Sequence, residues 1–141
     1  MDRAMLQPVV ALVGWTLVMV AWALAVRLPA MRAAGIELGK LVGTKGSDAD
    51  RVLPAKAQWP VHNYNHLLEQ PTLFYAVCFV LAAAGPAHPL NVALAWAYVG
   101  LRVAHSLVQA TFNRVSVRFL FFVLATLSLA ALTLHAAIAV F

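Results

Sequence analysis

Few charges and a single cysteine set this sequence apart from a soluble domain. Charged residues make up 11% of its 141 residues, whereas about 25% is usual in soluble globular domains. Acidic residues are scarcest, and Glu69 is the only one after Asp50. The single cysteine, Cys78, excludes an internal disulfide and a metal cluster built from cysteines. The rest is apolar, with 63% hydrophobic residues and a mean hydropathy of +0.83. A core of this size cannot bury so much apolar surface, so the chain is expected in a lipid bilayer.

Four apolar stretches are each long enough to cross a membrane as a helix, which takes about 20 residues. They cover residues 8–28, 61–84, 90–112 and 117–140, and the more polar residues 29–60 form the loop between the first two. The later connections are only a few residues long, so neighbouring helices must run antiparallel. The sequence therefore predicts a single all-α domain, an integral membrane four-helix up-down bundle.

The first stretch has a second interpretation. Ala23-Leu24-Ala25 resembles the cleavage site of a secretory signal peptide. However, Asp2 cancels the charge of Arg3 before the apolar run, and the run is longer than a usual signal core. A retained membrane helix is favoured.

The basic residues of the connections predict the orientation of the bundle. Lysine and arginine lie in the first and third connections and are absent from residues 85–89. The positive-inside rule then puts the basic loops in the cytoplasm and both termini outside. Because topology accounts for the basic residues, the net charge of +5 does not indicate a nucleic-acid partner.

The second apolar stretch begins with a polar face. Helical spacing of i, i+3, i+4 and i+7 places four polar residues on that face: His62, Asn65, His66 and Glu69. A carboxylate close to lipid is costly unless it is paired or faces the inside of a bundle. Pro71 is expected to kink this helix or to free a backbone carbonyl near Leu67. The stretch therefore predicts one wall of a polar pocket.

Two further polar groups are expected at the same, cytoplasmic side. The third stretch carries Arg102, His105 and Gln109 at i, i+3 and i+7. The fourth begins with Arg114 and Arg118, one helical turn apart. Arginines at a helix N-terminus oppose the helix dipole, so an anionic group is expected near them.

Three interpretations of these polar residues are open. In the first, Glu69 pairs with Arg102 as a structural salt bridge, while the other arginines reach lipid phosphates. In the second, the histidines and Glu69 bind a metal, but nearby arginines would repel a cation, so no metal is expected. In the third, the residues form a pocket for a small anion with several hydrogen-bonding groups, such as a peptide-like thiol. One glutamate cannot neutralise three arginines, which favours the third.

Two segments, HLLEQPTLFYA and LRVAHSLVQATFNRVSVRF, resemble the MAPEG family, the membrane-associated proteins of eicosanoid and glutathione metabolism, and in particular a bacterial branch of it. Eight positions match the family's motifs: Glu69, Pro71, Phe74, Arg102, Val103, His105, Arg114 and Arg118. Phe119 and Phe122 depart from the family's residues at the start of the fourth stretch, and three further departures fall on ligand-binding positions. The motif arginine and asparagine fall on His62 and His66, and Gln109 stands where a tyrosine is common.

The resemblance implies a homotrimer in the bacterial inner membrane, with glutathione bound between adjacent protomers near the cytoplasmic side. It implies that Arg118, with Arg114 second, stabilises the glutathione thiolate, since a cation lowers the pKa of a thiol. The remaining glutathione-binding residues would be His62, Asn65, His66, Glu69, Arg102, His105 and Gln109. The implied activity is that of a glutathione transferase or peroxidase acting on lipophilic electrophiles or lipid hydroperoxides. The three departures motivate an alternative, a non-catalytic relative that binds a lipid or serves as an accessory subunit of a membrane complex.

Overall fold

The computed structural model describes residues 1–141 and contains helices but no strands. Five α-helices and two short 3₁₀ helices follow in the order α1 (Arg3–Ala33), η1 (Leu38–Lys40), η2 (Gly46–Arg51), α2 (Ala55–Leu67), α3 (Gln70–Ala84), α4 (Pro89–Thr111) and α5 (Val115–Val140). The all-α class predicted from the sequence is confirmed. The bundle has one α-helix more than the four predicted, because the second apolar stretch is broken into α2 and α3.

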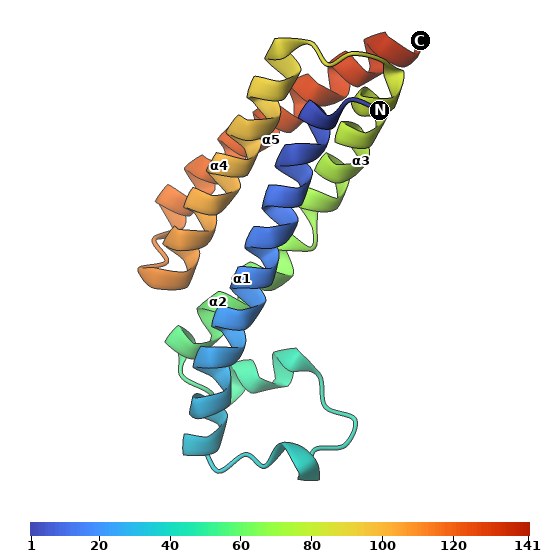
Figure 1. Ribbon diagram of the computed structural model, residues 1–141. Coiled ribbons are helices and arrows are strands. Elements are labelled where there is room, and N and C mark those ends of the chain that lie inside the picture. Colours follow the sequence, from blue (N-terminus) through green and yellow to red (C-terminus); the bar gives the residue numbers. More distant parts are fainter.

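α1, the consecutive pair α2 and α3, α4 and α5 alternate in direction and pack side by side (Figure 1). α4 packs most closely on α5, while α1 runs along α2 and α3 and also contacts α4. Both termini lie at the same end of the bundle as the turn between α3 and α4, and residues 34–54 form a loop at the opposite end (Figure 1). We call these the terminal end and the loop end of the bundle.

Three helical stretches are long and apolar enough to cross a membrane: Arg3–Ala33, Ala55–Ala84 (α2 with α3) and Val115–Val140. α4 has 23 residues, about 35 Å of helix, but it carries the buried polar residues and is not among the three. Large apolar side chains such as Leu17, Phe119 and Ile138 are exposed on the outside of the bundle. An apolar exterior is what a bilayer requires.

The apolar core joins α1, α3, α4 and α5. Phe74 of α3 is fully buried and stacks on Tyr98 of α4, with ring centroids 4.3 Å apart. Small residues are buried where helices meet, among them Ala82, Ala95 and Ala125. Small side chains let helix backbones approach closely, which is the main source of packing energy between helices in a membrane.

The terminal end is fastened by Asp2. Its carboxylate accepts hydrogen bonds from the backbone N–H of Ala4 (2.8 Å), which caps α1, and of Ala87 (2.6 Å) in the α3–α4 turn. Its own backbone N–H donates to the carbonyl of Ala82 (2.9 Å). Gly85 makes this turn possible, since its φ of +148° is a conformation that other residues rarely adopt. The start of the chain is thus tied to the far end of α3.

The second apolar stretch is interrupted at Leu68 and Glu69, just before Pro71. Glu69 has φ −91° and ψ −98°, outside the helical region, and α3 begins with Gln70 and Pro71. Because proline has no backbone N–H, it cannot bond to the carbonyl of Leu67. The interruption that Pro71 predicts is confirmed, as a break between two helices.

Candidate functional site

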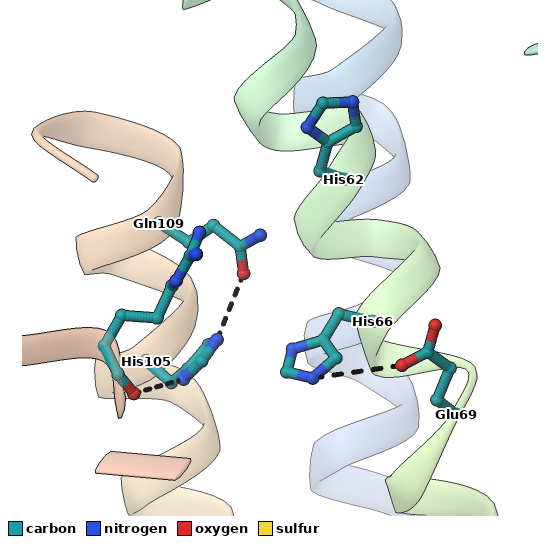
Figure 2. Close-up of a pocket in the computed structure, with 6 residues that line it drawn as sticks. His62, His66, Glu69, His105 and Gln109 are labelled. Carbon is teal, nitrogen blue, oxygen red and sulfur yellow. Dashed lines mark hydrogen bonds and ion pairs between the residues drawn. The ribbon is translucent and has the colours of Figure 1, made fainter. Parts of the chain in front are cut away.

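A polar pocket lies towards the loop end, between α2 and the hairpin of α4 and α5 (Figure 2). Its volume is about 270 Å³. None of the six side chains that line it is hydrophobic: His62, His66, Glu69, His105, Gln109 and Arg118. This apolar chain therefore gathers six hydrogen-bonding side chains around one cavity.

Arg118 is held in place by the turn between α4 and α5. Asn113 ends α4 with φ +48°, a left-handed conformation that asparagine tolerates, and its N–H donates to the carbonyl of Val108 (2.7 Å). The Oδ1 atom of Asn113 accepts a hydrogen bond from Nη1 of Arg118 (2.7 Å). Because this partner is neutral, the guanidinium is oriented at the pocket wall while its charge stays uncompensated.

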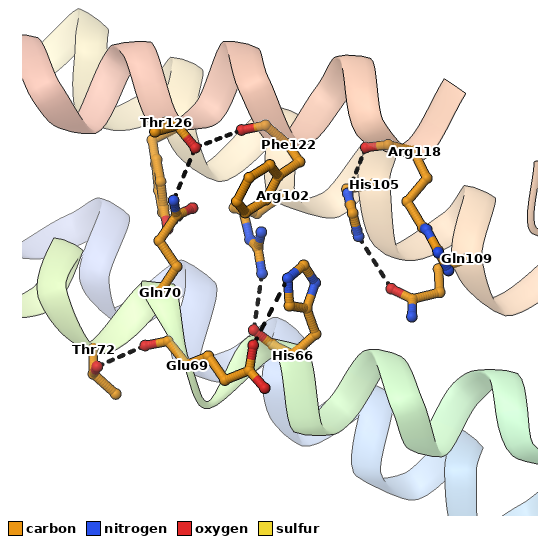
Figure 3. Close-up of polar contacts among 11 residues, drawn as sticks. His66, Glu69, Gln70, Thr72, Arg102, His105, Gln109, Arg118, Phe122 and Thr126 are labelled. Carbon is orange, nitrogen blue, oxygen red and sulfur yellow. Dashed lines mark hydrogen bonds and ion pairs between the residues drawn. The ribbon is translucent and has the colours of Figure 1, made fainter. Parts of the chain in front are cut away.

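His105 links α4 to α5 and faces the His66 ring of α2 across the pocket. Its Nδ1 lies 2.9 Å from the backbone oxygen of Arg118, and its Nε2 lies 3.0 Å from Oε1 of Gln109 (Figure 3). On the other side of the pocket, the ring of His66 lies 5.0 Å from that of His105 and stacks on Phe122 at 5.7 Å. The two imidazoles therefore meet across the pocket with their rings fixed by neighbours.

Arg102 lies behind the pocket and is fully buried. Its Nη2 donates to the backbone oxygen of His66 (3.0 Å), a carbonyl left without its usual i+4 partner by the break after α2. Its Nε and Nη1 have no hydrogen-bond partner. The expected ion pair between Arg102 and Glu69 is not formed, because the Glu69 side chain turns outward and is 70% exposed, 3.9 Å from Nε2 of His66.

The long loop reaches the pocket through His62. Its Nε2 lies 3.0 Å from a carboxylate oxygen of Asp50 in η2. Nearby, Nε2 of Gln58 donates to the backbone oxygen of Ala49 (2.8 Å). His62 therefore lines the pocket and also contacts the loop of residues 34–54. The helical spacing of the sequence does not predict this contact.

Comparison with known families decides the identity of this bundle. Residues 5–138 match the sequence profile of the MAPEG family, which is nearly the whole chain. The chain belongs to the MAPEG family. Comparisons with curated proteins and with solved structures find no match. The resemblance read from the sequence is confirmed, and with the apolar helices it identifies an integral membrane protein.

Three residues that the MAPEG resemblance assigns to glutathione lie outside the pocket lining. Asn65 is exposed at the edge of the α2 face. Arg102 is behind the pocket, where it caps the broken helix. Arg114 is exposed, because it precedes α5 in an extended conformation and so does not share the helical face of Arg118. Only Arg114 departs from the face predicted from spacing, and the glutathione-binding roles of all three residues stay predictions.

Sequence reasoning missed Asn113 and Asp50, which hold Arg118 and His62 from outside the helices. Asn113 carried one signal, since asparagine between two helices often adopts a left-handed turn. Asp50 carried none, because it is twelve residues from His62 in sequence. No three His, Cys, Asp or Glu side chains are grouped as a metal site, so the metal interpretation of the histidines has no geometric support.

Proposed function

We propose that this MAPEG protein is a glutathione-dependent membrane enzyme, a transferase or peroxidase for lipophilic electrophiles or lipid hydroperoxides. The observation that carries the proposal is Arg118, a cation held by the neutral Asn113 at the wall of a wholly polar pocket. No carboxylate lies within 4.0 Å of its guanidinium. Such a site favours a bound anion, and a thiolate is the anion that the family's chemistry uses.

The side chains that line the pocket are of the types that can bind the charged and polar groups of a glutathione-like peptide. Arg118 would hold the thiolate, and His62, His66 and Gln109 offer hydrogen bonds for the other polar groups of the peptide. Its volume of about 270 Å³ is below that of most ligand pockets, which span roughly 300–1,000 Å³. We infer that one chain supplies only part of the site and that a neighbouring protomer of a homotrimer completes it.

When bound, glutathione supplies a thiol whose sulfur either displaces a leaving group from an electrophilic carbon or, with a second thiol, reduces a hydroperoxide to alcohol and water as a disulfide forms. Arg118 lowers the free energy of the thiolate relative to the thiol, because a nearby cation favours the charged form. Phe112, Val115 and Phe119, on either side of the α4–α5 turn, are exposed. These apolar side chains give a lipophilic substrate a route from the bilayer to Arg118.

The orientation follows from the same geometry. The pocket lies towards the end of the bundle that carries the basic loop and the α4–α5 turn, while the α3–α4 turn has no lysine or arginine (Figure 1). By the positive-inside rule we place the pocket on the cytoplasmic side of a bacterial inner membrane, where glutathione is reduced.

Turnover of purified protein in lipid tests the proposal. We expect glutathione conjugation to a chlorodinitrobenzene-type substrate or reduction of a lipid hydroperoxide, and a loss of about a hundredfold in Arg118→Ala, as for other preorganised anion-stabilising groups. Arg32→Ala, an exposed arginine in the last turn of α1, is the matched control and should behave as wild type. Absence of glutathione-dependent turnover, or equal rates in wild type and Arg118→Ala, would refute it.

One observation favours the non-catalytic alternative. His62 stands at the motif arginine of the family and bonds to Asp50 of the same chain, so it is less free than an arginine to bind a substrate carboxylate. A pocket of this kind would suit a lipid headgroup. Native mass spectrometry in lipid separates the two: a retained phospholipid with no glutathione adduct supports the alternative, whereas saturable glutathione binding argues against it.

A further inference from the structure

The hydrogen bonds of His105 determine which atom of Gln109 faces the pocket. Both ring nitrogens of His105 lie opposite an oxygen, the backbone carbonyl of Arg118 at 2.9 Å and Oε1 of Gln109 at 3.0 Å. The ring orientation is fixed, since a half-turn of the ring would put carbon atoms against both positions. The backbone carbonyl can only accept, so Nδ1 of His105 carries a proton.

The second nitrogen allows two arrangements. Either Nε2 is also protonated and donates to Oε1 of Gln109, or the carboxamide is reversed and its NH₂ donates to an unprotonated Nε2. Oxygen and nitrogen of a glutamine side chain are told apart only by such hydrogen-bond logic. The choice therefore depends on whether His105 carries a positive charge.

A charge on His105 is disfavoured by its surroundings. The residue is 2% exposed, and none of the ion pairs in the structure brings a carboxylate within 4.0 Å of its ring. The groups that face it are the His66 ring, the buried Arg102 one turn earlier on α4, and the backbone carbonyl of Arg118. Burial without a counterion, near the cation of Arg102, favours the neutral imidazole.

We infer that His105 is the neutral Nδ1–H tautomer and that Gln109 presents its carbonyl oxygen to the pocket, where it selects a ligand that carries a hydrogen-bond donor beside its anionic group. In Figure 2 the atom of the Gln109 carboxamide that points away from His105 projects into the space between α4 and α2. With the carboxamide reversed, that atom is the oxygen. Gln109 is thus a specificity residue oriented by His105.

The combination defines the ligand class. Arg118 attracts an anion, and the Gln109 oxygen accepts an N–H, S–H or O–H on the same molecule. A peptide such as glutathione supplies both, whereas sulfate supplies only the anion. The inference about His105 stands on its hydrogen-bond geometry and its burial without a counterion, but the role given to Gln109 in selecting a peptide rests on the proposed function.

Nitrogen-15 NMR of histidine-labelled protein in lipid nanodiscs at neutral pH tests the tautomer directly. Assigned through its backbone, His105 is expected to show a protonated Nδ1 and an unprotonated Nε2. A protonated Nε2, in the imidazolium or in the opposite tautomer, overturns the inference. This readout requires neither a variant nor a bound ligand.

Two substitutions sharpen the test. In Gln109→Glu the ionised side chain can only accept, so His105 is expected to bind a second proton and to show both nitrogens protonated. In Gln109→Met it should stay neutral. The exposed Gln7 of α1 gives the matched control, and Gln7→Met should leave both the His105 spectrum and ligand binding unchanged. A protonated Nε2 in Gln109→Met contradicts the inference.

Ligand binding tests the selection step. Gln109→Met is expected to weaken glutathione binding about five- to tenfold, the effect of one lost hydrogen bond, and to leave sulfate binding at Arg118 no weaker. Equal weakening of both ligands overturns the role of Gln109. If wild type does not bind glutathione at all, the proposed function fails, while the NMR result still decides the state of His105.

Discussion

The two ends of the bundle treat their buried polar groups differently. At the terminal end, Asp2 bonds to Ala4 and Ala87, and the buried Asn91 accepts a hydrogen bond from His135 across α4 and α5. The loop-end half contains the pocket and polar atoms that are buried without partners. They belong to Gln58, Asn63, Arg102 and Ser106, and the one further such atom is Nε1 of Trp15, part-way along α1.

The difference matters because an unpaired buried polar group costs about 1–3 kcal/mol. Natural proteins accumulate such costs mainly where function requires them. The paired polar groups of the terminal end therefore stabilise the bundle. The unpaired polar groups of the loop end lower the free energy of unfolding in the half that contains the pocket. Three measurements test this difference between the two ends, and all follow reversible unfolding in mixed micelles by the loss of helicity.

The largest effect is expected at Arg102. It is the largest fully buried side chain, and Arg102→Ala leaves both a cavity and the carbonyl of His66 without its donor. We expect the free energy of unfolding to fall by about 3 kcal/mol. Arg102→Met, which fills most of the space, should cost about 1 kcal/mol. An Arg102→Ala protein as stable as wild type would show that removing the buried charge offsets the whole loss.

A matched pair of asparagines compares the two ends directly. Asn91 is paired with His135, whereas the fully buried Asn63 has no partner for its Oδ1 or its Nδ2. Asn91→Leu should lower the free energy of unfolding by about 1–2 kcal/mol, because His135 loses its partner. Asn63→Leu should raise it by up to about 1 kcal/mol, since an unpaired polar group is replaced by an apolar one. Equal losses in the two variants would remove the distinction between the ends.

The smallest effect is expected at Asp2 and depends on pH. The backbone N–H groups of Ala87 and Ala4 donate to the carboxylate and hold the pKa of Asp2 below its ordinary value of 3.8. Since the folded pKa is the lower one, the stabilisation is complete above the ordinary value and disappears as the pH falls through the folded pKa. The melting temperature of wild type should therefore exceed that of Asp2→Asn at neutral pH, and the two should converge in acid. A constant difference at all pH values would mean that the charge of Asp2 does not stabilise the terminal end.

Much of the site could be predicted because helical spacing is a local property. His62, His66 and Glu69 share a face by their spacing, as do His105 and Gln109, and the structure brings these faces together. The same spacing placed Arg114 beside Arg118, which fails because Arg114 lies before the first turn of α5. Spacing is informative only inside a helix, and the sequence does not locate helix ends to the residue.

Hydropathy and periodicity are properties of neighbouring residues, and they suffice to predict apolar helices in a membrane, the interruption at Pro71, and the gathering of polar residues on α2, α4 and α5. The partners of these polar residues could not be predicted in this way. Arg102 caps the carbonyl of His66 instead of pairing with Glu69, Asp50 reaches His62, and His105 lies between two oxygens. Those partners depend on how far each helix is rotated and shifted against the next, and only the packing of all five helices sets that rotation.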